Sequence, residues 1–252
     1  MNFFKKDNEI IFFHNEPSIT DLFPIVESKE LKLNWPNKLR QDLKNRVKKD
    51  TELDMYYNHV SRCPGIFDLF KYGYVVSLHK DIMIRPRGHG FEWETVKQEH
   101  LPNHFSIQVQ DKDTGTNLIP KPPWASDFII KINTGWHVVV PKGLKFIMLP
   151  IAYPDTFDFT STMGILDPSM TTEVNFQFWW TAEEEKQTLL QAGTPLGVLV
   201  PLSEKKYQMV QRTSTAQDKL WVSKMDSIFS SSFWPHTVRN KTIELYNNFW
   251  KK

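Results

Sequence analysis

The fold is decided by four apolar segments in the second half of the chain: WHVVVPKGLKFIMLP (136–150), MGILD (163–167), VNFQFWW (174–180) and LLQAGTPLGVLVPL (189–202). Their continuous apolar runs, such as VVV and FIML, are typical of strands that are covered on both faces. Pro141-Lys142-Gly143 indicates a turn between two strands, because proline presets its φ angle and glycine tolerates a positive one. We therefore predict that residues 128–202 form consecutive antiparallel β-strands.

The segment VNFQF alternates apolar and polar residues, which is typical of a strand with one packed face. Its apolar side chains would enter a core, and its polar side chains would be wetted or line a pocket. Tryptophans could stack on a sugar or a base in such a pocket, or pack in the core or an interface. The candidate pocket residues are Trp136, Asp167, Asn175 and Gln177.

The composition of the 252-residue chain is that of an ordinary globular protein, with 40% hydrophobic residues and a net charge of +2. This charge argues against a general nucleic-acid-binding protein. The single cysteine, Cys63, excludes an intrachain disulfide framework and favours a reducing compartment. No apolar run approaches the roughly 20 residues that span a bilayer. We therefore expect a cytoplasmic protein without a membrane segment, or one assembled into a particle.

About ten expected strands with short turns suggest a mainly β fold, with a jelly-roll or double-stranded β-helix-like antiparallel barrel. We expect residues 1–70 to form a mixed segment packed on the barrel. Its basic amphipathic helix at 37–49 carries leucine and valine at a spacing of four. Residues 71–203 would form the barrel or sandwich, with segments 74–78 and 81–85 as a strand pair. Residues 204–252 would form a tail of two helices, at 216–229 and 237–250.

His79-Lys80-Asp81 matches the pattern His-x-Asp, which can combine with a distant histidine to hold a non-haem iron. His137 lies on a predicted strand and could be the third ligand. Such a facial triad of His79, Asp81 and His137 leaves positions open for 2-oxoglutarate and oxygen. Lys145 could meet the acid co-substrate. This alternative makes the chain an Fe(II)/2-oxoglutarate-dependent oxygenase, whereas ordinary turn residues are the simpler interpretation of the motif.

Other residues suggest chemistry less directly. Cys63 could be a nucleophile with His59 or His79 as its base, although a cysteine before proline is more often a small packed side chain. We expect three further histidines to be exposed in loops: His89, His100 and His104. We expect four tryptophans to lie mainly in a core or interface: Trp124, Trp136, Trp179 and Trp180.

Gly164-Ile165-Leu166-Asp167 and Gly193-Thr194-Pro195-Leu196 resemble part of the pattern of trimeric dUTPases and dCTP deaminases. The resemblance covers about 40 residues and implies a jelly-roll chain that binds a nucleotide at a subunit interface. This chain departs from the family pattern at Pro168-Ser169-Met170 and at Val198. A dUTPase-like nucleotide hydrolase or deaminase is therefore a second alternative, and a turn-capping carboxylate is the simpler interpretation of Asp167.

A longer resemblance, from about Pro24 to Pro201, relates the chain to a family of uncharacterised proteins of cyanophages, related marine phages and some bacteria. The motifs that carry it are Cys63-Pro64-Gly65-Ile66-Phe67-Asp68, Gly73-Tyr74-Val75-Val76, Trp136, Pro141-Lys142-Gly143, Gly164-Ile165-Leu166-Asp167 and Gly193-Thr194-Pro195. The resemblance implies a β-rich fold and a phage source, and it brings no catalytic residues. We therefore expect a phage-related binding or assembly protein, as a homo-oligomer or with another protein, in the host cytoplasm or the virion.

Overall fold

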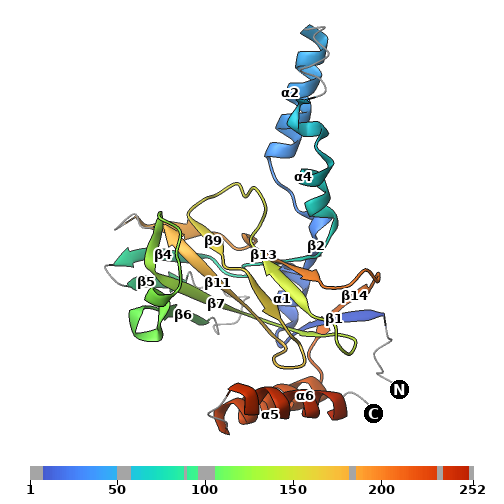
Figure 1. Ribbon diagram of the computed structural model, residues 1–252, viewed down its shortest axis with the longest axis vertical. Coiled ribbons are helices and arrows are strands. Elements are labelled where there is room, and N and C mark those ends of the chain that lie inside the picture. The colour runs from blue at the N-terminus through green and yellow to red at the C-terminus, as the bar shows by residue number, and fades with distance from the viewer. Residues whose placement is uncertain are drawn as a thin grey trace.

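The computed structural model describes residues 8–49, 58–87, 90–95, 106–181, 186–231 and 235–249, and its fold is mainly β (Figure 1). Three sheets make up the body. The six-stranded sheet contains, in spatial order, β14 (Gln208–Thr213), β1 (Glu9–His14), β7 (Ala125–Val139), β11 (Glu173–Thr181) and β9 (Phe159–Ser161), with β6 (Ser106–Gln110) also paired to β7. The five-stranded sheet contains β10 (Gly164–Leu166), β8 (Phe146–Leu149), β13 (Pro195–Pro201), β3 (Tyr74–Ser77) and β2 (Val26–Glu27). The small sheet contains β12 (Thr188–Leu190), β4 (Ile82–Arg87) and β5 (Gly90–Thr95).

The expected antiparallel strands are present, but most consecutive strands belong to different sheets. The chain passes from β7 in the six-stranded sheet to β8 in the five-stranded sheet, and returns with β9. The predicted pair at 74–78 and 81–85 is wrong, because β3 pairs with β13 and β2, whereas β4 pairs with β5 and β12. Within the described ranges, the strands form three separate sheets and do not close into one barrel.

The core lies between the six-stranded and five-stranded sheets. Phe12 on β1 meets Tyr74 on β3 edge to face, with ring centroids 5.4 Å apart. Phe176 on β11 packs directly on Gly197 of β13, where any Cβ atom would collide with the ring. The apolar alternation of VNFQF is confirmed, since the side chains at 174, 176 and 178 are all buried in this core. The two sheets are therefore held together by large aromatic side chains.

The first and last strands meet inside the six-stranded sheet. β1 pairs in parallel with β14, from Glu9 with Gln208 to His14 with Thr213. On its other edge β1 pairs antiparallel with β7. The body thus extends beyond residues 71–203 and takes β1 and β2 from the segment before it and β14 from the segment after it. No sequence pattern predicted β14, because its residues, QMVQRT, are mostly polar and none of them is buried.

Helices flank the sandwich on opposite sides (Figure 1). α1 (Pro17–Leu22) follows β1 directly, and short 3-10 turns occur at Ser28–Glu30, Lys112–Thr114 and Thr116–Leu118. At one end of the molecule α2 (Trp35–Lys49), the 3-10 turn Val60–Arg62, α4 (Pro64–Asp68) and the 3-10 turn Leu69–Lys71 project from the body. We call residues 34–49 and 58–72 the arm. The expected helix at 37–49 is confirmed as α2.

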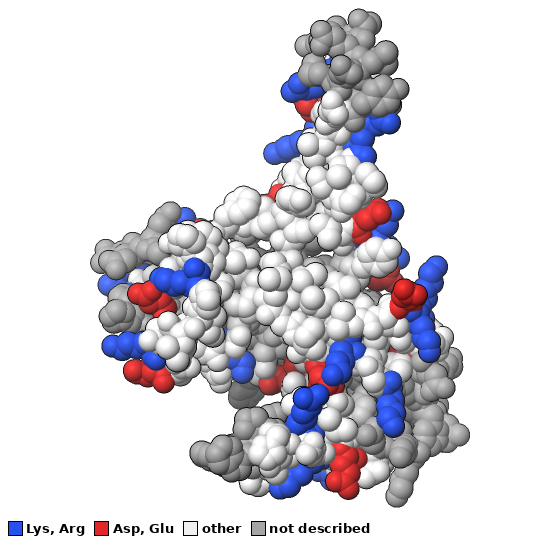
Figure 2. Space-filling view, in the orientation of Figure 1, with Lys and Arg blue, Asp and Glu red and all other residues white. Residues whose placement is uncertain are grey.

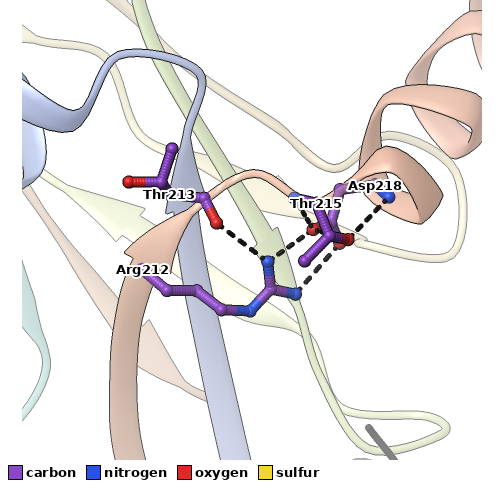
Figure 3. Close-up of polar contacts among 4 residues, drawn as sticks. All are labelled: Arg212, Thr213, Thr215 and Asp218. Carbon is purple, nitrogen blue, oxygen red and sulfur yellow. Dashed lines mark hydrogen bonds and ion pairs between the residues drawn. The ribbon is translucent and has the colours of Figure 1, made fainter.

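The two expected C-terminal helices are confirmed as α5 (Ala216–Ser231) and α6 (Pro235–Phe249). Asp218, in the first turn of α5, accepts hydrogen bonds from the backbone N–H and the hydroxyl of Thr215, and it forms an ion pair with Arg212 of β14 (Figure 3). The Tyr246 hydroxyl of α6 donates a 2.6 Å hydrogen bond to the carbonyl oxygen of Val140. These contacts fasten the helical pair to the six-stranded sheet.

Candidate functional site

A cavity of about 420 Å³ lies between β9, the last strand of the six-stranded sheet, and the start of β13. Residues 30–33, which lead from β2 towards α2, form another wall, and the loop from β8 to β9 forms a third. The apolar part of the lining comprises Val26, Leu31, Leu33, Ile151, Phe159 and Leu196. The cavity therefore lies where the edge strand of the six-stranded sheet comes near the start of β13 in the five-stranded sheet.

Ser161 supplies the most deeply buried polar group of this lining. Phe159 and Ser161 are two residues apart on β9, so their side chains share the face of the strand that points into the sandwich. Ser161 is only 4% exposed, and its hydroxyl group has no hydrogen-bond partner among the residues that the structure describes. A buried hydroxyl without a partner is unusual in a folded protein and destabilises it.

Charged residues of both signs also line the cavity. Glu30 and Lys32 come from the segment before α2, and Asp155 comes from the loop between β8 and β9. The Asp155 carboxylate accepts a 2.9 Å hydrogen bond from the side-chain amide of Asn34. Because acidic and basic side chains are both present, the lining does not present one sign of charge to a ligand.

The arm is attached to the body beside this cavity, through Trp35. The Trp35 indole N–H donates a 3.0 Å hydrogen bond to the carbonyl oxygen of Tyr153. Its ring meets the Tyr153 ring edge to face at 5.6 Å. Tyr153 has a φ of 50°, which is uncommon for a residue with a side chain and costs roughly 1 kcal/mol. A strained loop residue thus forms the joint between the arm and the sandwich.

The predicted iron ligands do not come together, so the facial triad is wrong. His79 lies on the core side of the six-stranded sheet, where its ring is 5.9 Å from that of His14. His137 lies on the outer side, stacked on Phe13 with ring centroids 5.0 Å apart. Asp81 accepts a 2.7 Å hydrogen bond from the backbone N–H of Ala192. In the described ranges no group of three or more His, Cys, Asp or Glu side chains is arranged to hold a metal ion.

The side chains of His79 and His137 point to opposite faces because of the register of β7. Trp136 and His137 are consecutive on this strand, so one enters the core and the other faces outwards. On the core face of the sheet, the Trp136 ring meets the His14 ring, with ring centroids 5.4 Å apart. The His14 ring in turn meets that of His79. The outer side carries His137, whose Nδ1 lies 3.1 Å from the Thr172 hydroxyl. A sheet therefore separates the two proposed ligands.

Burial changes the protonation of all three histidines in this region. It lowers the pKa of His79 to about 4, and the charges of His14 and Lys80 act in the same direction. It also lowers the pKa of His137 to about 4, against the opposing effect of the Glu173 carboxylate. The pKa of His14 is lowered by burial as well. These side chains are therefore neutral packing groups at neutral pH.

The four candidate pocket residues do not line one pocket. Trp136 is fully buried in the core, whereas Asn175 and Gln177 lie on the opposite face of the six-stranded sheet. There Asn175 donates to Glu173 at 2.8 Å, and Gln177 donates to Gln110 at 2.9 Å. The expectation fails because side chains on opposite faces of one sheet cannot line the same pocket.

Asp167 is a turn-capping residue, as its simpler interpretation predicted. Its carboxylate accepts a hydrogen bond from the backbone N–H of Ser169 at 3.1 Å and forms a 2.9 Å ion pair with Lys145. Burial opposes ionisation, but these hydrogen bonds leave the pKa of Asp167 below its usual value. Lys145 is therefore paired with Asp167, a contact not expected from its suggested role towards an acid co-substrate.

The remaining candidate residues also lie in different parts of the molecule. Cys63 is exposed at the surface of the arm, which differs from the packed side chain expected of it. His59 contacts Asp42 and Ser61, and His79 lies in the body. Three of the four tryptophans, at 136, 179 and 180, are buried as expected, and Trp124 is 43% exposed. His89, His100 and His104 lie outside the described residues.

The cavity itself was not foreseen from the sequence. Its walls come from segments that are far apart in the chain, and Ser161 lies in a strand of three residues with no motif around it. No helix in the described ranges is both long enough and apolar enough to cross a membrane. No protein-family model matches the chain, and a search of curated proteins finds no significant match.

Proposed function

We propose that this chain is a non-catalytic binding or assembly protein, and that the arm is the element that docks on a protein partner. The supporting observation is the exposure of the arm. Among its residues with described exposure, 34–47 and 58–72, none is buried. A helix without a buried face is poorly stabilised by its own packing, because helical stability in proteins comes mostly from tertiary contacts. Docking on a partner would supply such contacts.

The surface of α2 has the pattern of a helix that enters a groove. Leu39 and Leu43 are half-buried, and Val47, the next residue of this stripe, is 50% exposed. Val60 and Leu69 are also about half exposed, at 52% and 51%. Amphipathic helices use residues at this spacing as anchors in hydrophobic grooves. The apolar stripe thus provides the contact area of the proposed interface.

The charges beside the stripe indicate what kind of groove it would fit. α2 carries Lys38, Arg40, Lys44 and Arg46, and Figure 2 shows basic side chains along the arm. Arg46 is paired with Asp42 at 2.8 Å, and Arg40 lies over the Phe67 ring at 5.7 Å. The complementary partner is a protein groove with an apolar floor and an acidic rim. The resemblance to phage proteins extends the proposal to an assembly in a phage particle or an infected cell.

The experiment is a measurement of molar mass by size-exclusion chromatography with light scattering. We expect an oligomer of the 29.7 kDa chain, because the partner proposed for the arm is a second copy of the same chain. Val47→Asp should shift it towards the monomer, because a carboxylate would enter the apolar centre of the interface. Leu118→Asp is the matched control, since Leu118 is 82% exposed on the body. A wild-type monomer, or an oligomer that both variants leave intact, would contradict the proposal.

A further inference from the structure

We propose that the outer face of the five-stranded sheet is a contact surface for a second copy of the chain, centred on Ile165 of β10. This surface is distinct from the arm. The evidence is its apolar character, because the outward faces of sandwich sheets are usually polar. In β10, β8 and β13, residues that enter the core, namely Leu166, Phe146 and Leu199, alternate with residues on the opposite face.

The residues on this opposite face are aliphatic, and the strand register places them in two adjacent rows. The rows are Ile165, Ile147 and Val200 across β10, β8 and β13, and Leu149, Val198 and Val75 across β8, β13 and β3. Exposure increases along the sheet towards β10. Val75 is buried, the members on β8 and β13 are half-buried, and Ile165 is 57% exposed. The open end of the face is therefore at β10.

β10 is also an open edge of the sheet. In the part of the chain that the structure describes, no strand pairs with the edge of β10 opposite β8. Met163, just before the strand, is 74% exposed. Apart from its neighbours in the chain, no described atom lies within 4 Å of the Cβ position at Gly164. Edge strands commonly carry charged residues that prevent contacts with other chains, whereas β10 has the sequence GIL. This edge is therefore free to receive another chain.

The aliphatic character of the two rows favours a second copy as the partner. A twofold axis brings a surface against itself, so a patch of one charge repels its own copy, whereas an aliphatic patch is complementary to itself. The centre of the view in Figure 2, where β13 is labelled in Figure 1, is a broad uncharged area with charged side chains around it. Twisted sheets pack face to face through such aliphatic layers. The two copies of Ile165 thus lie near the twofold axis.

Another edge strand, β12, provides a matched control. It also has three residues, and its central residue, Leu189, is 45% exposed. The row that contains Leu189 continues through Met83 of β4 to Glu94 of β5. In the next row Arg85 pairs with Glu92. Because charged side chains accompany Leu189 on its face, this edge lacks the self-complementary surface of β10.

The first test is sedimentation velocity over a range of concentrations, with a chain that carries Val47→Asp to weaken association through the arm. We expect this chain to form a reversible dimer. Adding Ile165→Lys should weaken the dimer by more than about tenfold, because the ammonium group would lose its water in an apolar contact. Adding Leu189→Lys should leave the dissociation constant within about twofold. An effect of Val47→Asp reports on the arm, and an effect of Ile165→Lys reports on the sheet, so the two proposals can fail separately.

The second test locates the contact without adding a charge. In a Cys63→Ser chain, Ile165→Cys and Leu189→Cys each supply a single cysteine. A short bis-maleimide should link two Ile165→Cys chains into a covalent dimer and leave Leu189→Cys chains mostly unlinked. The midpoint of urea unfolding checks that each variant is folded. A Val47→Asp chain that stays monomeric, equal weakening by the two lysine variants, or equal cross-linking of the two cysteine variants would each overturn the proposal.

Discussion

Acidification should destabilise this protein through His79 and His137. Burial lowers both pKa values to about 4 in the folded chain. The same side chains have a pKa near 6.5 when the chain is unfolded. Between these values the unfolded state binds protons that the folded state does not, so the free energy of unfolding falls as the pH falls. The contribution of each histidine is complete above about pH 6.5 and is lost as the pH decreases towards about 4.

The size of the effect follows from the two pKa values. At about pH 5 the unfolded histidine is almost fully protonated and the folded one is mostly neutral, which amounts to about 2 kcal/mol for each residue. Both side chains are less than a tenth exposed, at 3% and 8%, so solvent does not screen them strongly. Together they should remove about 4 kcal/mol between about pH 7 and about pH 5, a large part of the stability of an ordinary domain.

Urea unfolding followed by tryptophan fluorescence measures this loss, at a series of pH values between about 7 and 5. His137→Gln should reduce the decrease in unfolding free energy by about 2 kcal/mol over this interval, because glutamine cannot take up the proton. His236→Gln is the control, since His236 is exposed on α6. Equal stability at both ends of the interval, or an unchanged pH dependence in His137→Gln, would refute the burial argument.

Three further variants test individual contacts, each by its midpoint of urea unfolding. Asp218→Ala should destabilise the chain by about 3 kcal/mol, because it leaves the partly buried Arg212 without its carboxylate and removes the cap of α5. Gly197→Ala should cost about 2 kcal/mol, since the new methyl group collides with Phe176 between the two sheets. Ser161→Ala should instead stabilise the chain by about 1 kcal/mol, because it removes a buried hydroxyl without a protein partner; a loss of stability would contradict that description of the site.

The sequence predicted the structure correctly where the spacing of apolar residues indicates a local strand or helix. The alternation in VNFQF placed Phe176 in the core, and the spacing of four in α2 identified that helix. Turn residues were less informative, because Pro141-Lys142-Gly143 marks the end of β7 but does not say which sheet receives the next strand. The pairing of β3 with β13 likewise depends on packing between distant segments. Local patterns therefore gave the elements and the mainly β class, and not the sheet order.

The candidate site was less predictable than the fold. The motif His79-Lys80-Asp81 suggested a metal site, but its residues entered separate environments because β3 and β4 belong to different sheets. Sequence proximity is a poor guide to a site when the chain changes sheet between the residues. Ser161 had no motif around it, and only the tertiary structure shows that its hydroxyl is buried without a protein partner. A cavity of this kind is formed by several segments that are far apart in the sequence.

The parallel pairing of β1 with β14 has a consequence for folding. Glu9 pairs with Gln208, so this strand pair can form only when most of the described chain is present. During synthesis β1 would keep one open edge until the segment containing β14 leaves the ribosome. Contacts between such distant residues slow folding, because a long loop must be closed before the contact forms. A chain truncated after β13 would leave β1 as an unprotected edge strand, which is a site for aggregation.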